Sequence, residues 1–114
     1  MSDSECRCCT PPFWHWDFDS RPVGVDETAG RFADISVEQC KLCVQKWLRY
    51  FYEYEAFSES GRWYRVAISD EEAASVTATT AVQLMCCRSW HFRGGSYFGT
   101  TGARCDWQID PRLL

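Results

Sequence analysis

Hydrophobic and polar residues alternate along three stretches of the chain, 13–19, 48–55 and 62–68. A period of two is typical of β-strands that bury one face. Many of the apolar positions are Trp, Tyr or Phe, which are common in strands. The second and third stretches are separated by a turn-forming run at 58–61. We therefore expect these two stretches to form an antiparallel hairpin.

Three shorter segments predict further extended structure. Residues 21–26 contain Pro22 and Gly24, which suit an edge strand or a turn. Residues 31–35 read as a short strand, and 88–92 form another aromatic alternation. We expect a turn at Gly94 and Gly95, and a loop over 100–114.

Two short helices are expected between residues 69 and 87. Ser69 followed by Glu72 forms a capping box, with acidic residues in the first turn, and Thr77 could cap a second helix. The segment 36–56 is ambiguous, because Ser36 and Gln39 also match a capping box. We favour a strand for the later part of this segment and keep a helix as the alternative.

Cysteines supply the main candidate chemistry. Cys40 and Cys43 form one Cys-x2-Cys pair and Cys6 and Cys9 form a second, with thirty residues between the pairs. Each such pair presents two thiolates on a tight turn, and a tetrahedral zinc ion takes four. We predict a structural zinc site made by these four residues. Cys8 is an alternative ligand of the N-terminal pair.

This spacing resembles that of the zinc ribbon, in which two cysteine hooks are bridged by antiparallel strands. The resemblance covers about residues 6–68 and implies a ribbon-like clamp. Hooks of that family commonly read Cys-Pro-x-Cys-Gly, whereas Thr10 and Val44 stand at the glycine positions here. The fold expected is thus α+β: a mainly antiparallel sheet with a zinc-ribbon-like clamp and two short helices. We expect one domain over 1–114, comprising a β part (6–68), a helical part (69–87) and an aromatic hairpin with a tail (88–114).

Other reactive residues have simpler interpretations. Cys86, Cys87 and Cys105 could serve thiol or redox chemistry, but we favour core packing at a helix end. His15, Asp17 and Asp19 would share one strand face, where solvated polar residues are ordinary. No Ser-His-Asp or Cys-His pairing stands out, so we do not expect an enzyme.

The net charge of the chain indicates which class of partner it would bind. The chain has 114 residues and a formal net charge of −4, which suits a basic protein partner better than nucleic acid. We expect no signal peptide and no membrane span, and hence a cytoplasmic protein whose thiols remain reduced. A secreted disulfide framework is the competing interpretation. The function expected is a protein–protein interaction module such as a bacterial immunity or antitoxin-type protein. Alternatives are a nucleic-acid-associated zinc ribbon, such as a transcription accessory factor, and a redox protein.

Overall fold

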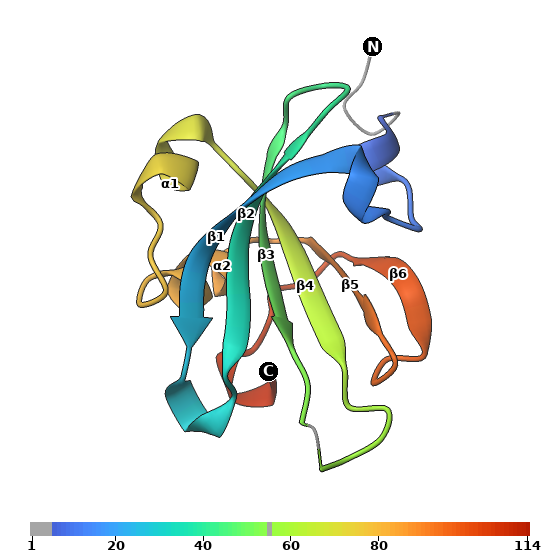
Figure 1. Cartoon of the computed structure of the whole chain (residues 1–114), viewed down its shortest axis with the longest axis vertical. Helices are drawn as coiled ribbons and strands as arrows, with labels where there is room; N and C mark the ends of the chain where they lie inside the picture. The colour runs from blue at the N-terminus through green and yellow to red at the C-terminus, as the bar shows by residue number, and fades with distance from the viewer. Residues whose placement is uncertain (1–5, 55) are drawn as a thin grey trace.

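The protein is an antiparallel sheet with two short helices, in a computed structural model that describes residues 6–54 and 56–114. Figure 1 shows the sheet, whose six strands follow one another in space as they do in the chain. Each strand pairs antiparallel with the next, so β1 and β6 form the two edges. The strands are β1 (Phe18–Asp26), β2 (Ala33–Cys40), β3 (Lys46–Tyr52), β4 (Arg62–Ile68), β5 (His91–Gly95) and β6 (Thr100–Cys105).

The helices α1 (Asp70–Ser75) and α2 (Ala81–Cys86) follow β4 and precede β5 in the chain. They cover one face of the sheet (Figure 1). The predicted capping box is present in α1: the backbone N–H of Glu72 donates to the Ser69 hydroxyl, and the backbone N–H of Ser69 donates to the Glu72 carboxylate. Ala73 of α1 and Ala81 and Met85 of α2 are buried against the sheet. No helix within the described ranges is both long and apolar enough to cross a membrane.

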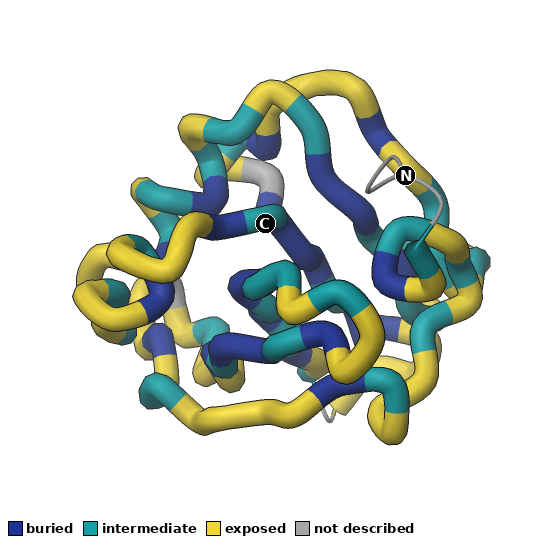
Figure 2. Tube along the Cα trace, turned by 90° about the horizontal axis from the view of Figure 1, so that it is seen from above, coloured by how far each residue is buried: buried dark blue, intermediate teal, exposed yellow. Residues whose placement is uncertain are grey.

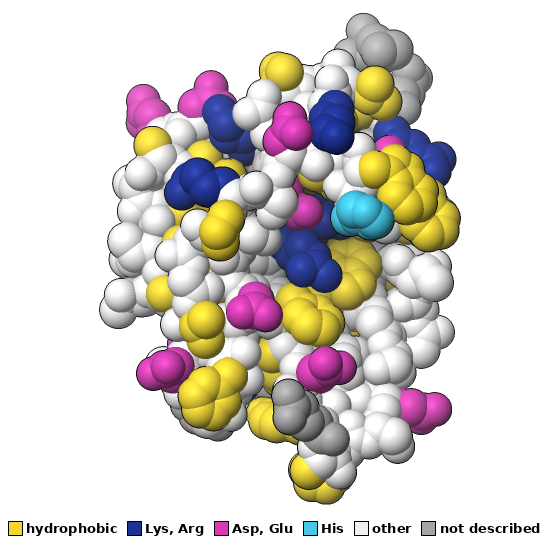
Figure 3. Space-filling view, viewed as in Figure 1, with side chains coloured by type: hydrophobic (Ala, Val, Ile, Leu, Met, Phe, Trp, Pro, Cys, Tyr) yellow, Lys and Arg dark blue, Asp and Glu magenta, His cyan; other side chains and the backbone are white. Residues whose placement is uncertain are grey.

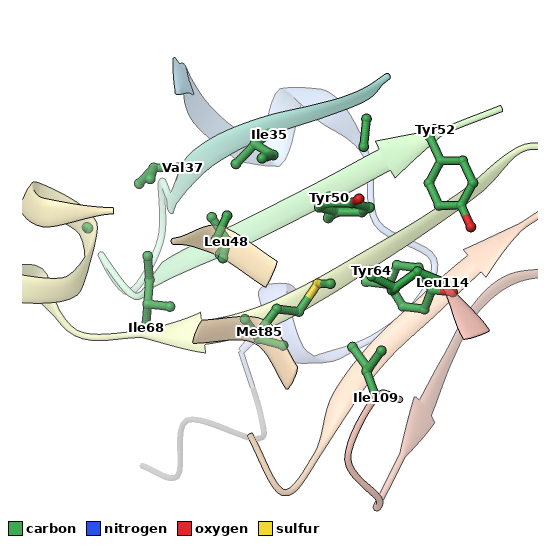
Figure 4. Close-up of a cluster of buried hydrophobic side chains, with 14 residues drawn as sticks. Ile35, Val37, Leu48, Tyr50, Tyr52, Tyr64, Ile68, Met85, Ile109 and Leu114 are labelled. Atoms are coloured by element: carbon green, nitrogen blue, oxygen red, sulfur yellow. The ribbon is translucent and has the colours of Figure 1, made fainter. Parts of the chain in front are cut away.

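The main core lies on this helix-covered face. Alternate residues of the central strands point into it, because successive side chains of a strand face opposite sides. Figure 4 shows several of these side chains meeting between the sheet, α2 and the C-terminal residues. In the view of Figure 2 the buried segments lie inside a more exposed outer trace. The strand residues of this core are Ala33, Ile35, Val37, Leu48, Tyr50, Tyr52, Tyr64, Val66 and Ile68.

The opposite face of the sheet is different. It carries a smaller buried cluster at one end, formed by Cys8, Phe18, Cys40, Trp47 and Phe92. Next to that cluster lie buried charged residues, among them Glu38 and Arg65. We call this side of the sheet the open face, because neither α1 nor α2 packs on the buried cluster there.

Several sequence-based expectations are confirmed. The α+β class with an antiparallel sheet, the hairpin (β3 and β4) and both short helices are all present. The helical alternative for 36–56 is wrong, since β2 and β3 occupy that segment. Residues 21–26 belong to the edge strand β1, and 31–35 overlap the beginning of the longer β2.

Three expectations need correction. A strand over 13–19 is wrong for most of its length: His15–Asp17 form a 3-10 turn, and β1 begins at Phe18. The expected turn at Gly94 and Gly95 lies within β5, and the chain turns just after it.

The third correction concerns the C-terminal segment, where β6 replaces part of the loop expected over 100–114. Gly102 accounts for part of this difference, because its φ is +153° and a Cβ there would lie 2.9 Å from Pro11. A glycine that suggested a loop instead allows another segment to pack closely on a strand.

Candidate metal centre

The hook formed by Cys40 and Cys43 lies in the connection between β2 and β3. Cys40 is the last residue of β2, and its backbone N–H donates to the carbonyl of Gln45 at 2.9 Å. The N–H of Val44 donates back to the carbonyl of Cys40 at 3.1 Å, which closes the turn. The N–H of Leu42 points at the Cys40 sulfur, 3.4 Å away. The hook therefore presents two sulfurs and directs a backbone donor at one of them.

Val44 adopts a conformation that normally favours glycine. Its φ is +57°, in the left-handed region. This is the position at which hooks of the zinc-ribbon type commonly have glycine. Val44 stands where glycine is common, yet it still adopts the left-handed conformation. This conformation is strained for a β-branched residue.

The N-terminal cysteines lie on a 3-10 turn, Arg7–Cys9. The N–H of Cys9 donates to the carbonyl of Cys6 at 2.9 Å, and the hydroxyl of Thr10 donates to the same carbonyl at 3.2 Å. This tight turn directs the sulfurs of Cys6 and Cys8 toward the second hook. The Cys6 sulfur lies 3.6 Å from that of Cys40, and the Cys8 sulfur lies 3.5 Å from that of Cys43.

The four sulfurs of Cys6, Cys8, Cys40 and Cys43 all lie within 4.8 Å of one another. Around an ideal zinc centre with Zn–S distances of about 2.3 Å, the sulfurs would be roughly 3.8 Å apart. The group could therefore hold a metal ion. The group includes Cys8, which we gave as the alternative ligand, and does not include Cys9.

The surroundings of the sulfurs have opposing effects on their pKa values. The backbone N–H of Cys8, directed at the Cys6 sulfur, lowers the pKa of Cys6. Burial raises the pKa of Cys8 and that of Cys43. Four thiolates this close would repel one another strongly, and a divalent cation removes that repulsion.

The four-cysteine group brings the N-terminal arm, defined here as residues 6–17, against the β2–β3 connection. The arm is held at further points along its length. The ring of Phe13 packs edge-on against those of Phe18, Trp63 and Phe92, with centroids 6.4, 5.8 and 4.9 Å away. At the end of the arm, the backbone N–H of Lys41 donates to the carbonyl of Asp17 at 3.1 Å.

The other sequence-based candidates do not form a second metal site within the described residues. Among the described residues, the four-cysteine group is the only cluster of at least three His, Cys, Asp or Glu side chains placed to share a metal. Asp17 pairs with Arg7 at 3.7 Å, and His15 packs against the ring of Trp16. Burial raises the pKa of Cys86 to about 11 and also raises that of Cys105, which makes both thiols less reactive.

The assignment of Cys8 in place of Cys9 can be tested with matched serine variants. Cys8→Ser should reduce the bound metal from about one ion per chain to far below that, because serine does not supply a thiolate. Cys9→Ser should keep the metal, since its sulfur is outside the group. Elemental analysis of the two purified proteins measures this difference. Loss of metal in Cys9→Ser alone would contradict the assignment.

Comparisons with models of known protein families, with curated proteins and with solved structures yield no match.

Proposed function

We propose that this protein is a non-catalytic interaction module, stabilised by one structural zinc ion, that binds a basic protein partner. The observation that carries the proposal is the gathering of four cysteine sulfurs within 4.8 Å. Four thiolates fill the tetrahedral coordination of zinc and leave no position for water or substrate. A site of this kind supports a fold and performs no Lewis-acid chemistry.

The centre would act as a zinc-ribbon clamp does, by joining two hooks from distant parts of the chain. One hook keeps the Cys-x2-Cys spacing, at Cys40 and Cys43, while the other uses Cys6 and Cys8 with one residue between them. The clamp would anchor the N-terminal arm. The anchored arm would in turn hold a short segment of exposed aromatic residues in a fixed place on the surface.

That segment contains Trp14 and Trp16. Their rings are stacked, with centroids 5.1 Å apart and planes 2° from parallel. Both side chains are exposed, Trp14 at 41% and Trp16 at 56%. Exposed tryptophan is a costly surface residue and is enriched among the hot spots of protein interfaces. We propose that this tryptophan pair forms the apolar centre of the partner-binding surface.

The distribution of charge supports a protein partner over nucleic acid. The arginines that alternate with aromatic residues in the sequence could have formed a basic nucleic-acid-binding face. Instead, Arg62 is only 6% exposed and Arg65 only 4%. Arg88 pairs with Glu72. Acidic side chains remain at the surface, including those of Asp34 and Glu59, and this suits a basic partner.

One concrete form of this function is a bacterial immunity or antitoxin protein that covers a basic toxin. The net charge of −4 and the exposed tryptophan pair suit such a task. A transcription accessory factor would need an exposed basic surface. A redox protein would need accessible, activated thiols, whereas burial raises the pKa of Cys86 and of Cys105.

The test is affinity capture from the host, followed by reconstitution with the purified partner. The wild type should retain a basic protein, and the double variant Trp14→Ser/Trp16→Ser should bind it at least about tenfold more weakly, as expected for loss of hot-spot residues. Phe57→Ser is the control, because Phe57 is 69% exposed and lies in the β3–β4 connection. Capture of DNA or RNA with a steep salt dependence would instead support the nucleic-acid alternative.

A further inference from the structure

A second feature of the open face is a pocket of about 370 Å³ beside the N-terminal arm. This volume falls within the range of small-molecule sites. In Figure 3 the same face of the molecule is hollowed near its middle, with Lys or Arg side chains in the hollow, hydrophobic side chains below them and a histidine at the rim. The pocket is lined by residues of β1, β2, β3, β4 and β6 and of the arm, among them Ser36, Glu38, Arg49, Arg65, Phe13 and Trp63.

Strand register places two arginines directly opposite each other in this pocket. Arg49 of β3 pairs with Arg65 of β4 on one side and with Ser36 of β2 on the other. Like charges in directly opposite positions destabilise a sheet unless something compensates them. Each guanidinium therefore needs a carboxylate or an aromatic ring close by, and the two arginines differ in the partners that they have.

Arg65 has an acidic partner. Its Nε donates to Oε1 of Glu38 at 3.0 Å, and one terminal nitrogen donates to the same oxygen. Its guanidinium also lies over the rings of Phe13 and Phe18, 4.8 and 4.5 Å from their centroids. The single carboxylate that lines the pocket is thus bound to Arg65.

Arg49 is not partnered in this way. Within the described part of the chain it makes no hydrogen bond or ion pair, and its contact is with the ring of Phe51 at 5.2 Å. Burial and the neighbouring charge of Arg65 lower the pKa of Arg49, and the carboxylates of Glu38 and Asp34 act against this. A half-buried guanidinium with unused donors faces a pocket that has one more arginine than carboxylate.

We propose that this pocket binds a small ligand through an oxyanion, either a carboxylate or a phosphate, held by Arg49. A guanidinium binds such groups in a bidentate manner, with two parallel N–H donors. The hydroxyl of Ser36 lies across the strand pair as a further donor. Phe13 and Trp63 form an apolar wall that suits a planar, aromatic ligand body. The inference is independent of the partner-binding function.

The probes for calorimetric titration of the full chain are phenyl phosphate and benzoate, with benzamide as the uncharged control. Both anions should bind saturably, and benzamide should not. Arg49→Gln should weaken binding roughly ten- to hundredfold, as expected for loss of a charge-assisted pair. Arg112→Gln, a matched change at an 87% exposed side chain, should leave affinity unchanged. Tighter binding of phenyl phosphate indicates a phosphate ligand, and tighter binding of benzoate a carboxylate.

A second variant keeps the proposal testable if Arg49→Gln folds poorly. Ser36→Asp places a carboxylate directly across the strand pair from Arg49, where it would occupy the donors itself. This variant should fold at least as stably as wild type and should no longer bind either anion. Absence of saturable binding by the wild type up to about 10 mM, or unchanged affinity in well-folded Arg49→Gln or Ser36→Asp, would overturn the proposal.

Discussion

Cys40→Ser should release the metal and lower the free energy of unfolding by about 5 kcal/mol or more. Cys40 is fully buried, and its sulfur lies 3.6 Å from that of Cys6. Structural zinc contributes apparent binding free energies of about 10–16 kcal/mol in small zinc domains, and much of this is folding free energy. Total domain stabilities are about 5–15 kcal/mol, so the loss is comparable with the whole stability. Thermal and denaturant unfolding measure the effect.

The damage should begin in the N-terminal arm. Cys8 and Cys40 belong to the cluster on the open face, whereas the main core on the helix-covered face contains neither. Without the metal, the arm would retain the contacts of Phe13 but lose its attachment at Cys6 and Cys8. Trypsin should then cleave after Arg7 much faster than in the wild type.

Cys87→Ser provides the control for this experiment. Cys87 is exposed and outside the four-cysteine group, so the same chemical change should leave metal content, cleavage rate and stability close to those of the wild type. Full metal content and an unchanged melting temperature in Cys40→Ser would contradict the expected role of the centre.

Glu38→Ala should cost about 3–5 kcal/mol of stability, the penalty for removing one partner of a buried ion pair. The side chains of Glu38 and Arg65 are only 7% and 5% exposed. Loss of the carboxylate would leave Arg65 uncompensated and directly opposite Arg49. Urea unfolding at fixed pH measures the cost.

A double-mutant cycle separates this charge effect from lost packing. The cycle compares Glu38→Gln, Arg65→Met and Glu38→Gln/Arg65→Met. Each single change leaves one charge buried without its partner, while the double change removes both charges. The double variant should be more stable than the sum of the two single changes implies, because neither charge is then stranded. Additive effects would show that the pair contributes little beyond its side-chain packing.

Local patterns predicted the hairpin and the first helix well. Tyr50 and Tyr64 lie on the same face of adjacent strands and are paired across them, as alternation requires. The capping box at Ser69 formed as expected, since its two hydrogen bonds depend on residues only three positions apart. By contrast, the capping box at Ser36 did not form a helix. Ser36 instead pairs with Arg49 within the sheet, where tertiary pairing overrides local propensity.

The N-terminal arm was the part least predictable from the sequence. Trp14 and Trp16 alternate with polar residues as a strand would, yet they are exposed and stacked on each other. The arm is fixed by contacts with residues distant in the chain, such as Phe13 against Phe92.

The cysteine spacing correctly brought two distant segments together, but spacing alone could not distinguish Cys8 from Cys9. That choice depends on the 3-10 turn at Arg7–Cys9 and on which sulfurs then face the second hook. The sequence did not indicate that Arg49 lacks an acidic partner. The pairing of Glu38 with Arg65 depends on how β2, β3 and β4 are aligned.

X-ray absorption at the zinc edge, on protein purified under reducing conditions without added metal, tests the four-cysteine centre most directly. The expected result is about one zinc ion per chain with four sulfur neighbours at about 2.3 Å. Natively folded protein without metal, or zinc bound mainly by nitrogen or oxygen, would contradict a centre built from Cys6, Cys8, Cys40 and Cys43.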